Sequence, residues 1–481
     1  MVFSSITFLF YFLPLFFLLY YLSAGHNLIL LTASVLFYAW GEPRYLPLLF
    51  FYIVINWALG LWLEHTTKDR RWILTIGIAS NLALLFYFKY FNFFIDQLNA
   101  IRRTLDLEVW STGVIPLALG ISFFTFQAIS YLVDVFRGDV AAERSLLTFA
   151  TYMAMFPKLI AGPIVRYKEV AGRLSRRVIL PSRMRYGIQR LMLGLAQKVL
   201  IANTVALPAD EIFALSPHDL TAATAWLGIA CYTLQIYFDF AGYSNMAIGL
   251  AHMMGFTFPE NFNRPYASQS ITEFWRRWHM TLSGWLRDYL YIPLGGNRLS
   301  HARTYANLVI VFVLCGFWHG ASWTFLAWGL YQGIFLVLER AGLAAALSAL
   351  WCPLRHLYLV IAVMIGWVLF RSETIVQAGQ YLMAMFGSGQ GEPLMTPVAR
   401  YLTPSVLMAI TVGVLFSVAA VPGEKRIIAR LRKHLGTGPG SRVLPEVGVR
   451  VALDLGSLAL LGFAALIMAT GTYNPFLYFR F

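Results

Sequence analysis

The sequence predicts an all-α integral membrane protein that crosses the bilayer many times. Of its 481 residues, 59% are hydrophobic and only 12% are charged, whereas an average soluble domain carries about 25% charged residues. The apolar residues form continuous runs rather than the alternating pattern of a membrane β-barrel. At roughly 20 residues per crossing, the chain allows about 11–13 membrane helices with re-entrant pieces. This composition excludes a soluble enzyme, a disordered chain, a disulfide-rich secreted domain and a nucleic-acid-binding module.

Apolar runs in the first half of the chain define the first candidate helices. No basic segment precedes the N-terminal run, which favours a retained first span over a cleaved signal peptide. Several runs are shorter than the roughly 17 residues that a full crossing needs, so we expect some to be tilted or re-entrant. In order, the runs cover residues 5–22, 27–40, 45–63, 72–94, 113–136, 146–162 and 187–207.

The second half of the chain also consists mainly of apolar runs, with one polar interruption at residues 257–303. Its apolar runs cover residues 222–256, 304–318, 321–339, 356–370, 404–421 and 451–470. No repeat of 20–50 residues and no pair of matched halves is visible, as solenoids and many transporters would show. We therefore treat residues 1–481 as a single membrane domain.

The net charge of +14 comes chiefly from two basic stretches. Residues 166–190 carry eight Lys or Arg against one acid, and residues 424–450 carry seven against two. The positive-inside rule places both on the cytoplasmic side, which explains the charge without a nucleic-acid partner. Counting crossings back from the first stretch puts the N-terminus inside. That count also puts Lys68, Arg70 and Arg71 outside, so the orientation of the early helices stays open.

A helix is predicted inside the polar interruption. Ser270 and Glu273 have the spacing of a capping box, in which each side chain accepts a hydrogen bond from a backbone N–H at the helix start. The helix should begin at Ser270 and end before Pro293. Spacings of three and four residues place its large apolar side chains on one face. These side chains are Trp275, Trp278, Leu282, Trp285 and Tyr289.

One interpretation of this helix is that it lies in the membrane interface. Its tryptophans would then sit at headgroup level, and Arg276, Arg277 and Arg287, which lie off the apolar face, would point toward lipid phosphates. His279 flanks the apolar face. A single histidine in such a position is more often structural than catalytic.

His319 is a more informative histidine, because it follows the apolar run 304–318. A helix from Tyr305 would carry it about 21 Å, some two-thirds of the way through a hydrocarbon core of roughly 30 Å. An ionisable side chain at that depth is costly, so it is a functional candidate by default. The alternative is that His319 hydrogen-bonds a neighbouring helix.

Three other ionisable residues lie in or near apolar runs. Asp239 falls inside the run 222–256 and must face a partner or a wet cavity. There it either orients a substrate or another side chain, or ties two helices together. Lys89 and Asp134 fall near the ends of their runs, where snorkelling or a loop-end ion pair accounts for them. The histidines show no metal-ligand spacing, so no metal site is expected.

Several motifs resemble those of the membrane-bound O-acyltransferase family, and in particular its branch that modifies bacterial polysaccharides. The longest is Gln-Ile-Tyr-Phe-Asp-Phe-Ala-Gly-Tyr-Ser-Asn-Met-Ala-Ile-Gly at residues 235–249. The others are residues 1–5, 88–93, 119–127, 156–166, 270–297 and 478–481 and the tripeptide Trp318-His319-Gly320. The resemblance implies one domain over residues 1–481, with a motif core at about residues 115–340 and membrane helices around a central tunnel.

The resemblance also implies site residues. The invariant histidine of the family matches His319 and a second histidine matches His279, which gives both a catalytic role. Substrate-binding roles are predicted for Asp239, Asn245, Arg287 and Trp318, although relatives more often have Asp at the position of Asn245. Acetyl transfer needs a base near the acceptor hydroxyl and a donor to the developing oxyanion. His319 would be the base, and His279 or a tryptophan N–H would hold the oxygen; an acyl-histidine is the alternative.

The implied reaction is O-acetyl transfer from cytoplasmic acetyl-CoA, with no permanently bound cofactor, to an extracytoplasmic polysaccharide of the alginate type. The implied protein is a multi-pass component of the cell inner membrane and works with a periplasmic partner of the SGNH-hydrolase type. Peptidoglycan and cellulose are alternative acceptors. Two other classes stay open at this point, namely a transporter or flippase of a polysaccharide precursor and a scaffold of a polymer-export complex.

Overall fold

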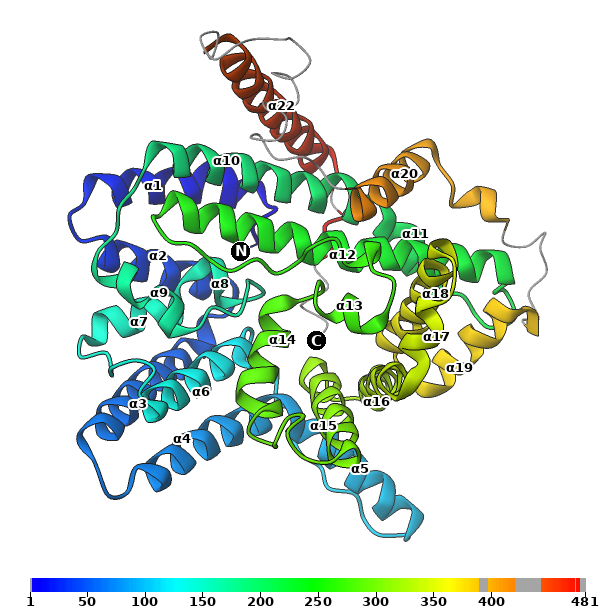
Figure 1. Cartoon of the computed structure of the whole chain (residues 1–481), viewed down its shortest axis with the longest axis horizontal. Coiled ribbons are helices and arrows are strands. Elements are labelled where there is room, and N and C mark those ends of the chain that lie inside the picture. The colour runs from blue at the N-terminus through cyan, green and yellow to red at the C-terminus, as the bar shows by residue number, and fades with distance from the viewer. Residues whose placement is uncertain (1, 389–396, 420–442, 472, 476–481) are drawn as a thin grey trace.

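The computed structural model describes residues 2–388, 397–419, 443–471 and 473–475 (Figure 1). Within these residues the regular elements are helices, and no strand occurs. This arrangement confirms the all-α class.

Seven helical stretches of the described chain are long and apolar enough to cross a membrane, and three apolar helices are shorter. The long stretches are Pro43–His65, Arg70–Thr104, Pro181–Phe213, His301–His319, Trp323–Ser348, Cys352–Arg371 and Val447–Thr470. The shorter helices are Thr7–Leu22, His26–Gly41 and Pro404–Val418. Together they support a multi-pass membrane protein, and the total of 11–13 membrane helices stays a prediction.

The first third of the chain forms helices η1 to α9. Their bounds are η1 (Thr7–Phe12), α1 (Leu13–Leu22), α2 (His26–Gly41), η2 (Pro43–Tyr45), α3 (Leu46–His65), α4 (Arg70–Leu85), η3 (Phe86–Tyr90), α5 (Phe91–Thr104), α6 (Ile121–Arg137), α7 (Leu146–Ala154), α8 (Phe156–Leu159) and α9 (Tyr167–Ser175). The apolar run 146–162 is split into α7 and α8 at Met155, whose ψ of 111° is not helical. This run therefore makes no single full-length helix, although its 17 residues are sufficient for one crossing.

Helix α12 (Ala222–Met253), most of whose residues are buried, packs against α10 (Pro181–Ala196). Glycines allow the close approach: a Cβ on Gly194 would lie 2.5 Å from the Gly242 carbonyl oxygen, and one on Gly242 would lie 2.7 Å from that of Gly194. Small residues of this kind are the usual means of joining membrane helices. Helix α10 continues through η4 (Gln197–Ala202) into α11 (Asn203–Phe213).

The predicted helix between Ser270 and Pro293 is broken, and this corrects the sequence prediction. After η5 (Pro265–Ala267) come α13 (Ile271–Trp275), α14 (Met280–Leu286) and η6 (Arg287–Tyr291). The Ser270 hydroxyl caps α13 as expected, by accepting the Glu273 N–H at 3.1 Å. The break falls at His279, whose φ is +42°. A left-handed residue cannot continue a right-handed helix.

The interfacial interpretation of this segment is also wrong. Trp275, Trp278, Leu282 and Trp285 are buried inside the protein. The Trp275 indole donates to Gln332 of α16 (Trp323–Leu338), and the Trp285 indole stacks on Phe126 of α6 at 3.8 Å. The periodic aromatic face therefore belongs to the protein core and not to the lipid headgroups.

The C-terminal half completes the helices around the centre of the molecule. In Figure 1, α12, α13, α14, α15 and α16 surround this centre, and α22 projects from the edge. The remaining bounds are α15 (His301–His319), η7 (Glu339–Leu343), α17 (Ala344–Ser348), α18 (Cys352–Arg371), α19 (Ile375–Met383), η8 (Ala384–Ser388), η9 (Val398–Arg400), α20 (Pro404–Val418) and α22 (Val443–Thr470). Most of the basic stretch 424–450 lies outside the described residues.

Candidate active site

His319 is the last residue of α15 and is 7% exposed. Its ring meets Trp328 of α16 edge to face at 5.4 Å and Phe370 of α18 at 5.1 Å. The neighbouring Trp318 ring lies 5.0 Å away. The imidazole is thus held among aromatic rings from two further helices, with no carboxylate among these contacts.

The position of His319 depends on close packing of α15 against α16. A Cβ on Gly316 would lie 2.2 Å from the Phe325 carbonyl oxygen, and one on Gly329 would lie 2.3 Å from that of Phe312. Only glycine permits this approach from both sides. The helix end that carries His319 is therefore fixed directly against α16.

Lys89 also holds the end of α15, a role that the sequence did not reveal. Its ammonium donates to the backbone oxygens of Trp318 at 2.6 Å and His319 at 3.1 Å, and to Ser122 Oγ at 3.1 Å. These carbonyls are at the negative end of the helix dipole, where a cation is favourable. Neither snorkelling nor a loop-end pair describes Lys89.

For Asp134 the loop-end pair is confirmed, because its carboxylate accepts from Lys168 at 3.0 Å and Tyr289 at 2.8 Å.

His279 lies at the break between α13 and α14 and is fully buried. Its ring packs edge to face on Phe240 of α12 at 4.6 Å and lies 6.4 Å from the Trp318 ring. Trp318 therefore lies close to both histidines. The two imidazoles thus share one site around the Trp318 ring.

Local capping interactions set the position of α13 before this break. The backbone N–H groups of Ile271 and Thr272 donate to the buried Glu339 carboxylate at 2.6 and 2.8 Å. A carboxylate at a helix N-terminus satisfies N–H groups that have no partner inside the helix. Glu339 thus anchors the segment that leads to His279.

Three buried polar atoms around the histidines have no hydrogen-bond partner among the described residues. They are Nε2 of His279, Nε1 of Trp318 and Nε1 of Trp328. Leaving such atoms unpaired costs free energy, so their presence in a native site requires an explanation. A ligand with polar atoms would satisfy them, which makes this cluster a candidate for substrate recognition.

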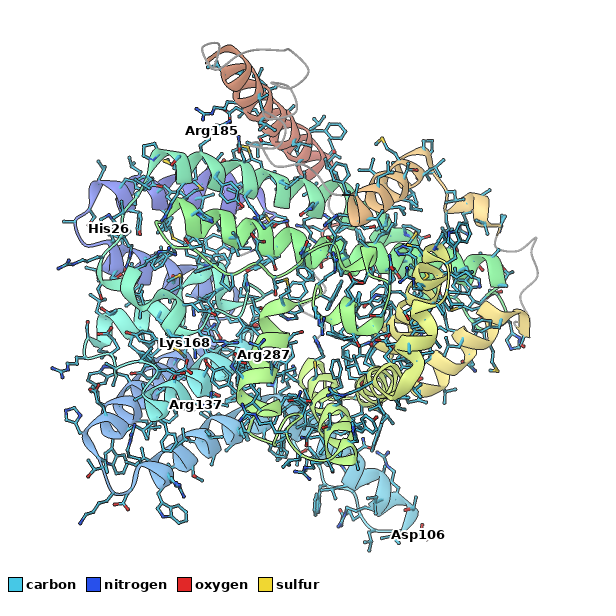
Figure 2. The ribbon with its side chains drawn as sticks, viewed as in Figure 1. His26, Asp106, Arg137, Lys168, Arg185 and Arg287 are labelled. Atoms are coloured by element: carbon cyan, nitrogen blue, oxygen red, sulfur yellow. The ribbon has the colours of Figure 1, made fainter. Side chains whose placement is uncertain are left out.

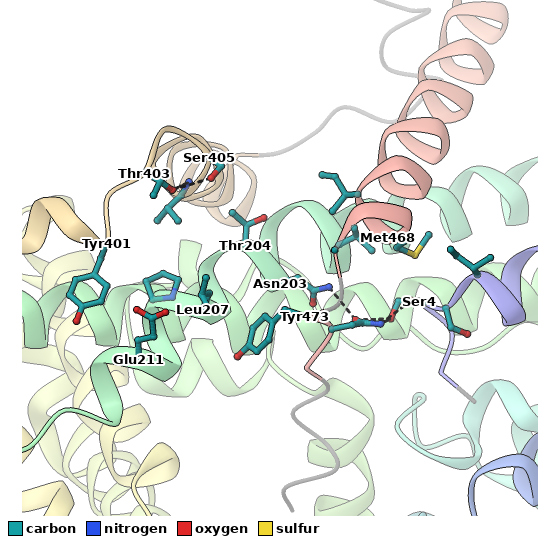
Figure 3. Close-up of a pocket in the computed structure, with 18 of the residues that line it drawn as sticks. Ser4, Asn203, Thr204, Leu207, Glu211, Tyr401, Thr403, Ser405, Met468 and Tyr473 are labelled. Carbon is teal, nitrogen blue, oxygen red and sulfur yellow. Dashed lines mark hydrogen bonds between the residues drawn. The ribbon is translucent and has the colours of Figure 1, made fainter.

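The cavity at His319 is small. It has a volume of about 30 Å³ and is lined by Lys89, Ser122, Trp318, His319 and residues 117–121, 123 and 160. A much larger cavity of about 770 Å³ lies elsewhere, at Ser4, Asn203, Glu211 and Tyr401 (Figure 3). None of the predicted site residues lines the larger cavity. The predicted central tunnel stays a prediction.

The side chains of Asp239 and Asn245, both on α12, contact α10 and η4. Asp239 pairs with Lys198 of η4 at 2.5 Å, and both side chains are 3% exposed. The Asn245 side chain accepts from Arg190 at 2.8 Å and donates to Gln197 at 2.6 Å. These contacts join α12 to α10 and η4, which agrees with the interpretation that Asp239 ties two helices together. Substrate-binding roles for both residues stay predictions.

Arg287 lies apart from the histidines on a charged surface. Its side chain is 65% exposed and pairs with Asp288 at 2.7 Å. Arg166 pairs with Asp288 at 2.7 Å, and Arg137 donates to the Asp288 backbone oxygen at 3.1 Å. Figure 2 shows Arg137, Lys168 and Arg287 in one region. Burial raises the pKa of the Asp288 carboxyl, but hydrogen bonds from Arg287 and Arg166 lower it more, so that this pKa lies below its ordinary value.

The structure thus brings together His319, His279 and Trp318 and adds Lys89 to them. This is a buried histidine site in a multi-pass helical membrane protein. Residues 16–370 match the sequence profile of the membrane-bound O-acyltransferase family. The chain belongs to this family, and it is an acyltransferase rather than a transporter or a scaffold.

Individual relatives carry more specific names. The chain is 43% identical over 502 residues to the "Probable alginate O-acetylase AlgI" of Azotobacter vinelandii, with all of both chains covered. It is 48% identical over 395 residues to the protein of that name from Pseudomonas aeruginosa, covering 81% of this chain and 75% of the relative. It is also 35% identical over 427 residues to the "Peptidoglycan O-acetyltransferase" of Helicobacter pylori, covering 80% of each.

Replacing Lys89 with methionine should lower acyl transfer about 100-fold, because a displacement of about 1 Å at a reacting group can cost that much. Methionine fills similar space but cannot donate to the Trp318 and His319 carbonyls. The rate should be measured per mole of folded protein. Lys89→Arg keeps the charge and should retain more activity than Lys89→Met. An unchanged rate in Lys89→Met would contradict the role of Lys89 at the end of α15.

Proposed function

We propose that this protein transfers acetyl groups from acetyl-CoA toward a hydroxyl of an extracytoplasmic polysaccharide of the alginate type, from the cell inner membrane. The support for polysaccharide O-acetylation comes from relatives that are 40–48% identical and are named alginate O-acetylases. The observation that carries the chemistry is the position of His319, buried at the end of α15 beside a second histidine and unpaired indole N–H groups.

The acetyl transfer follows from these groups. The oxygen of an acceptor hydroxyl, on the group that passes the acetyl on to the polymer, attacks the thioester carbonyl carbon. Its proton moves to the His319 imidazole, which acts as general base. An N–H from Trp318 or His279 holds the oxygen that becomes negative. The carbon–sulfur bond then breaks, and the imidazolium returns the proton to the CoA thiolate. An acyl-histidine intermediate would divide the same transfer into two steps.

The charged surface around Arg287 is the proposed approach for the donor. Arg137, Arg166 and Lys168 belong to it, and a CoA-type donor carries several phosphates. Clustered cations raise the local concentration of an anionic substrate. The acetyl group is then proposed to reach the polymer through a periplasmic acyltransferase of the SGNH-hydrolase type.

The test uses purified full-length protein in lipid vesicles with acetyl-labelled acetyl-CoA. We expect loss of label from the thioester, by transfer or hydrolysis, in the wild type and not in His319→Ala. An intact thioester in both would contradict acetyl-CoA as donor.

For the acceptor, O-acetyl content is measured on each cell-surface polymer after deletion of the gene. Loss from peptidoglycan or cellulose, with exopolysaccharide unchanged, would replace the alginate-type acceptor.

A further inference from the structure

Asn261 is a buried asparagine that contacts His279 from the loop after α12. Its side chain is 1% exposed, and its Oδ1 lies 3.1 Å from Nδ1 of His279. Backbone hydrogen bonds hold the two segments together, from Met280 N–H to the Asn261 carbonyl at 2.9 Å and from Asn263 N–H to that of Arg277 at 2.9 Å. They support the left-handed backbone of His279, a conformation uncommon outside glycine.

The orientation of the Asn261 amide follows from its other partners. The Thr281 backbone N–H, which can only donate, lies 3.3 Å from Oδ1. The Thr281 hydroxyl lies 2.8 Å from Oδ1, and it donates there because its oxygen already accepts the Ile164 N–H at 3.0 Å. On its other side, Asn261 donates from Nδ2 to Ser244 Oγ at 3.0 Å. Oδ1 is therefore the carbonyl oxygen and the acceptor.

The proton of neutral His279 is located by this acceptor. A hydrogen bond between Nδ1 and a carbonyl oxygen requires the hydrogen on Nδ1, so that Nε2 has a lone pair and no hydrogen. Nε2 is buried and has no hydrogen-bond partner among the described residues. Neutral His279 can thus accept a proton at Nε2, but it cannot donate an N–H from that atom.

We propose that Asn261 is a positioning residue that keeps the proton of His279 on Nδ1 and thereby makes Nε2 a hydrogen-bond acceptor for the substrate. The proposal rests on the acetyl transfer proposed above and separates its roles. Neutral His279 does not hold the developing oxyanion, and the Trp318 N–H does. His319 takes the hydroxyl proton and returns it to the CoA thiolate, while the Nε2 lone pair of His279 accepts a hydrogen bond from a donor on the substrate.

The charged groups around His279 are few. The titratable groups of this site are His319, whose ring lies near Trp318 as that of His279 does, and Lys89, which donates to the His319 carbonyl oxygen. The side chains packed on His279 from α12, the loop and α15 are Phe240, Phe262 and Trp318, which do not titrate. A shift in pH dependence caused by a change at Asn261 can therefore be assigned to this histidine pair.

The kinetic test compares Asn261→Leu and Asn261→Asp with wild-type protein and labelled acetyl-CoA. Leucine removes the acceptor and frees the tautomer, so kcat should fall about 100-fold with KM for acetyl-CoA unchanged. Aspartate keeps the acceptor and stabilises the imidazolium, so it should retain activity and move the acid limb of the kcat profile to higher pH. Asn99→Leu is the matched control, because Asn99 is a buried asparagine that binds Trp110 of the loop after α5. Its pH profile should equal that of the wild type.

Nitrogen NMR of protein labelled at the histidine ring nitrogens identifies the tautomer of His279, and it does not depend on enzyme activity. The His279 signal is assigned by its loss in His279→Gln, and we expect hydrogen on Nδ1 in the wild type. Hydrogen on Nε2, wild-type kcat in Asn261→Leu or an unshifted acid limb in Asn261→Asp would each overturn the role of Asn261. Wild-type protein that is inert toward acetyl-CoA but has hydrogen on Nδ1 would instead overturn the proposed donor.

Discussion

Replacing His319 with alanine should abolish acetyl transfer to the polymer while the protein stays in the membrane. The substitution removes the imidazole at the end of α15, and a general base contributes about 10²- to 10⁴-fold to the rate. The helix end should keep its place, because Lys89 binds backbone oxygens there and not the ring. The measurement is polymer-bound O-acetyl per amount of membrane protein, in cells that lack the native copy.

His301→Ala is the matched control for this experiment. His301 begins the same helix that His319 ends, and it is exposed. It should leave acetylation at the wild-type level. Near-wild-type acetylation in His319→Ala would contradict the catalytic role of His319. Loss of the protein from the membrane in that variant would contradict the expectation that the end of α15 folds without the His319 ring.

Breaking the Lys198–Asp239 pair should be the most destabilising change. Both side chains are buried, and removing one partner of a buried pair typically costs about 3–5 kcal/mol, because the remaining charge is left uncompensated. Asp239→Leu and Lys198→Met should therefore each lower the melting temperature and the yield of protein in detergent. Wild-type stability in either variant would contradict a structural role for the pair.

The double variant Lys198→Met/Asp239→Leu distinguishes the two interpretations of Asp239. Replacing a buried pair by apolar residues of similar volume is often neutral, so stability should return. We expect acetyl transfer to return with it, because the contacts of Asp239 tie α12 to η4. A stable but inactive double variant would instead assign Asp239 to substrate binding.

Much of the fold class follows from composition and periodicity. Long apolar runs and few charges are sufficient to predict a helical membrane protein, because lipid requires each backbone polar group to be paired within the segment. His319 could also be singled out from the sequence as a candidate site residue, since an ionisable residue at membrane depth is rare. Both predictions depend on local features of the chain.

The break at His279 could not be predicted in the same way. The aromatic spacing of three and four residues persists across it, because Trp275, Trp278 and Trp285 all pack into the core on either side of the break. The left-handed φ of His279 depends on hydrogen bonds to the Asn261 loop, which precedes the two short helices. A tertiary contact therefore overrides a helical pattern that looks continuous.

Lys89 was missed because its partners are remote in the sequence. Its hydrogen bonds to the Trp318 and His319 carbonyls span 229 and 230 residues. The pattern of apolar runs indicates how far into the membrane a lysine lies, but it does not indicate which carbonyl oxygens the lysine binds. Only the fold shows that this cation is part of the site.

The same long-range contact has a consequence for biogenesis. At about 5–20 residues per second of synthesis, the ribosome needs roughly 10–50 s to complete α15 after Lys89 has left it. During this interval a lysine in the bilayer, which costs about 2.5–3.5 kcal/mol by insertion scales, can meet Ser122, the partner synthesised soonest. Until α15 has been made, the helical stretch Arg70–Thr104, which carries Lys89, therefore lacks the two carbonyl partners of that lysine. The candidate site around His319 is thus completed late, when Lys89 receives the Trp318 and His319 carbonyls as its final partners.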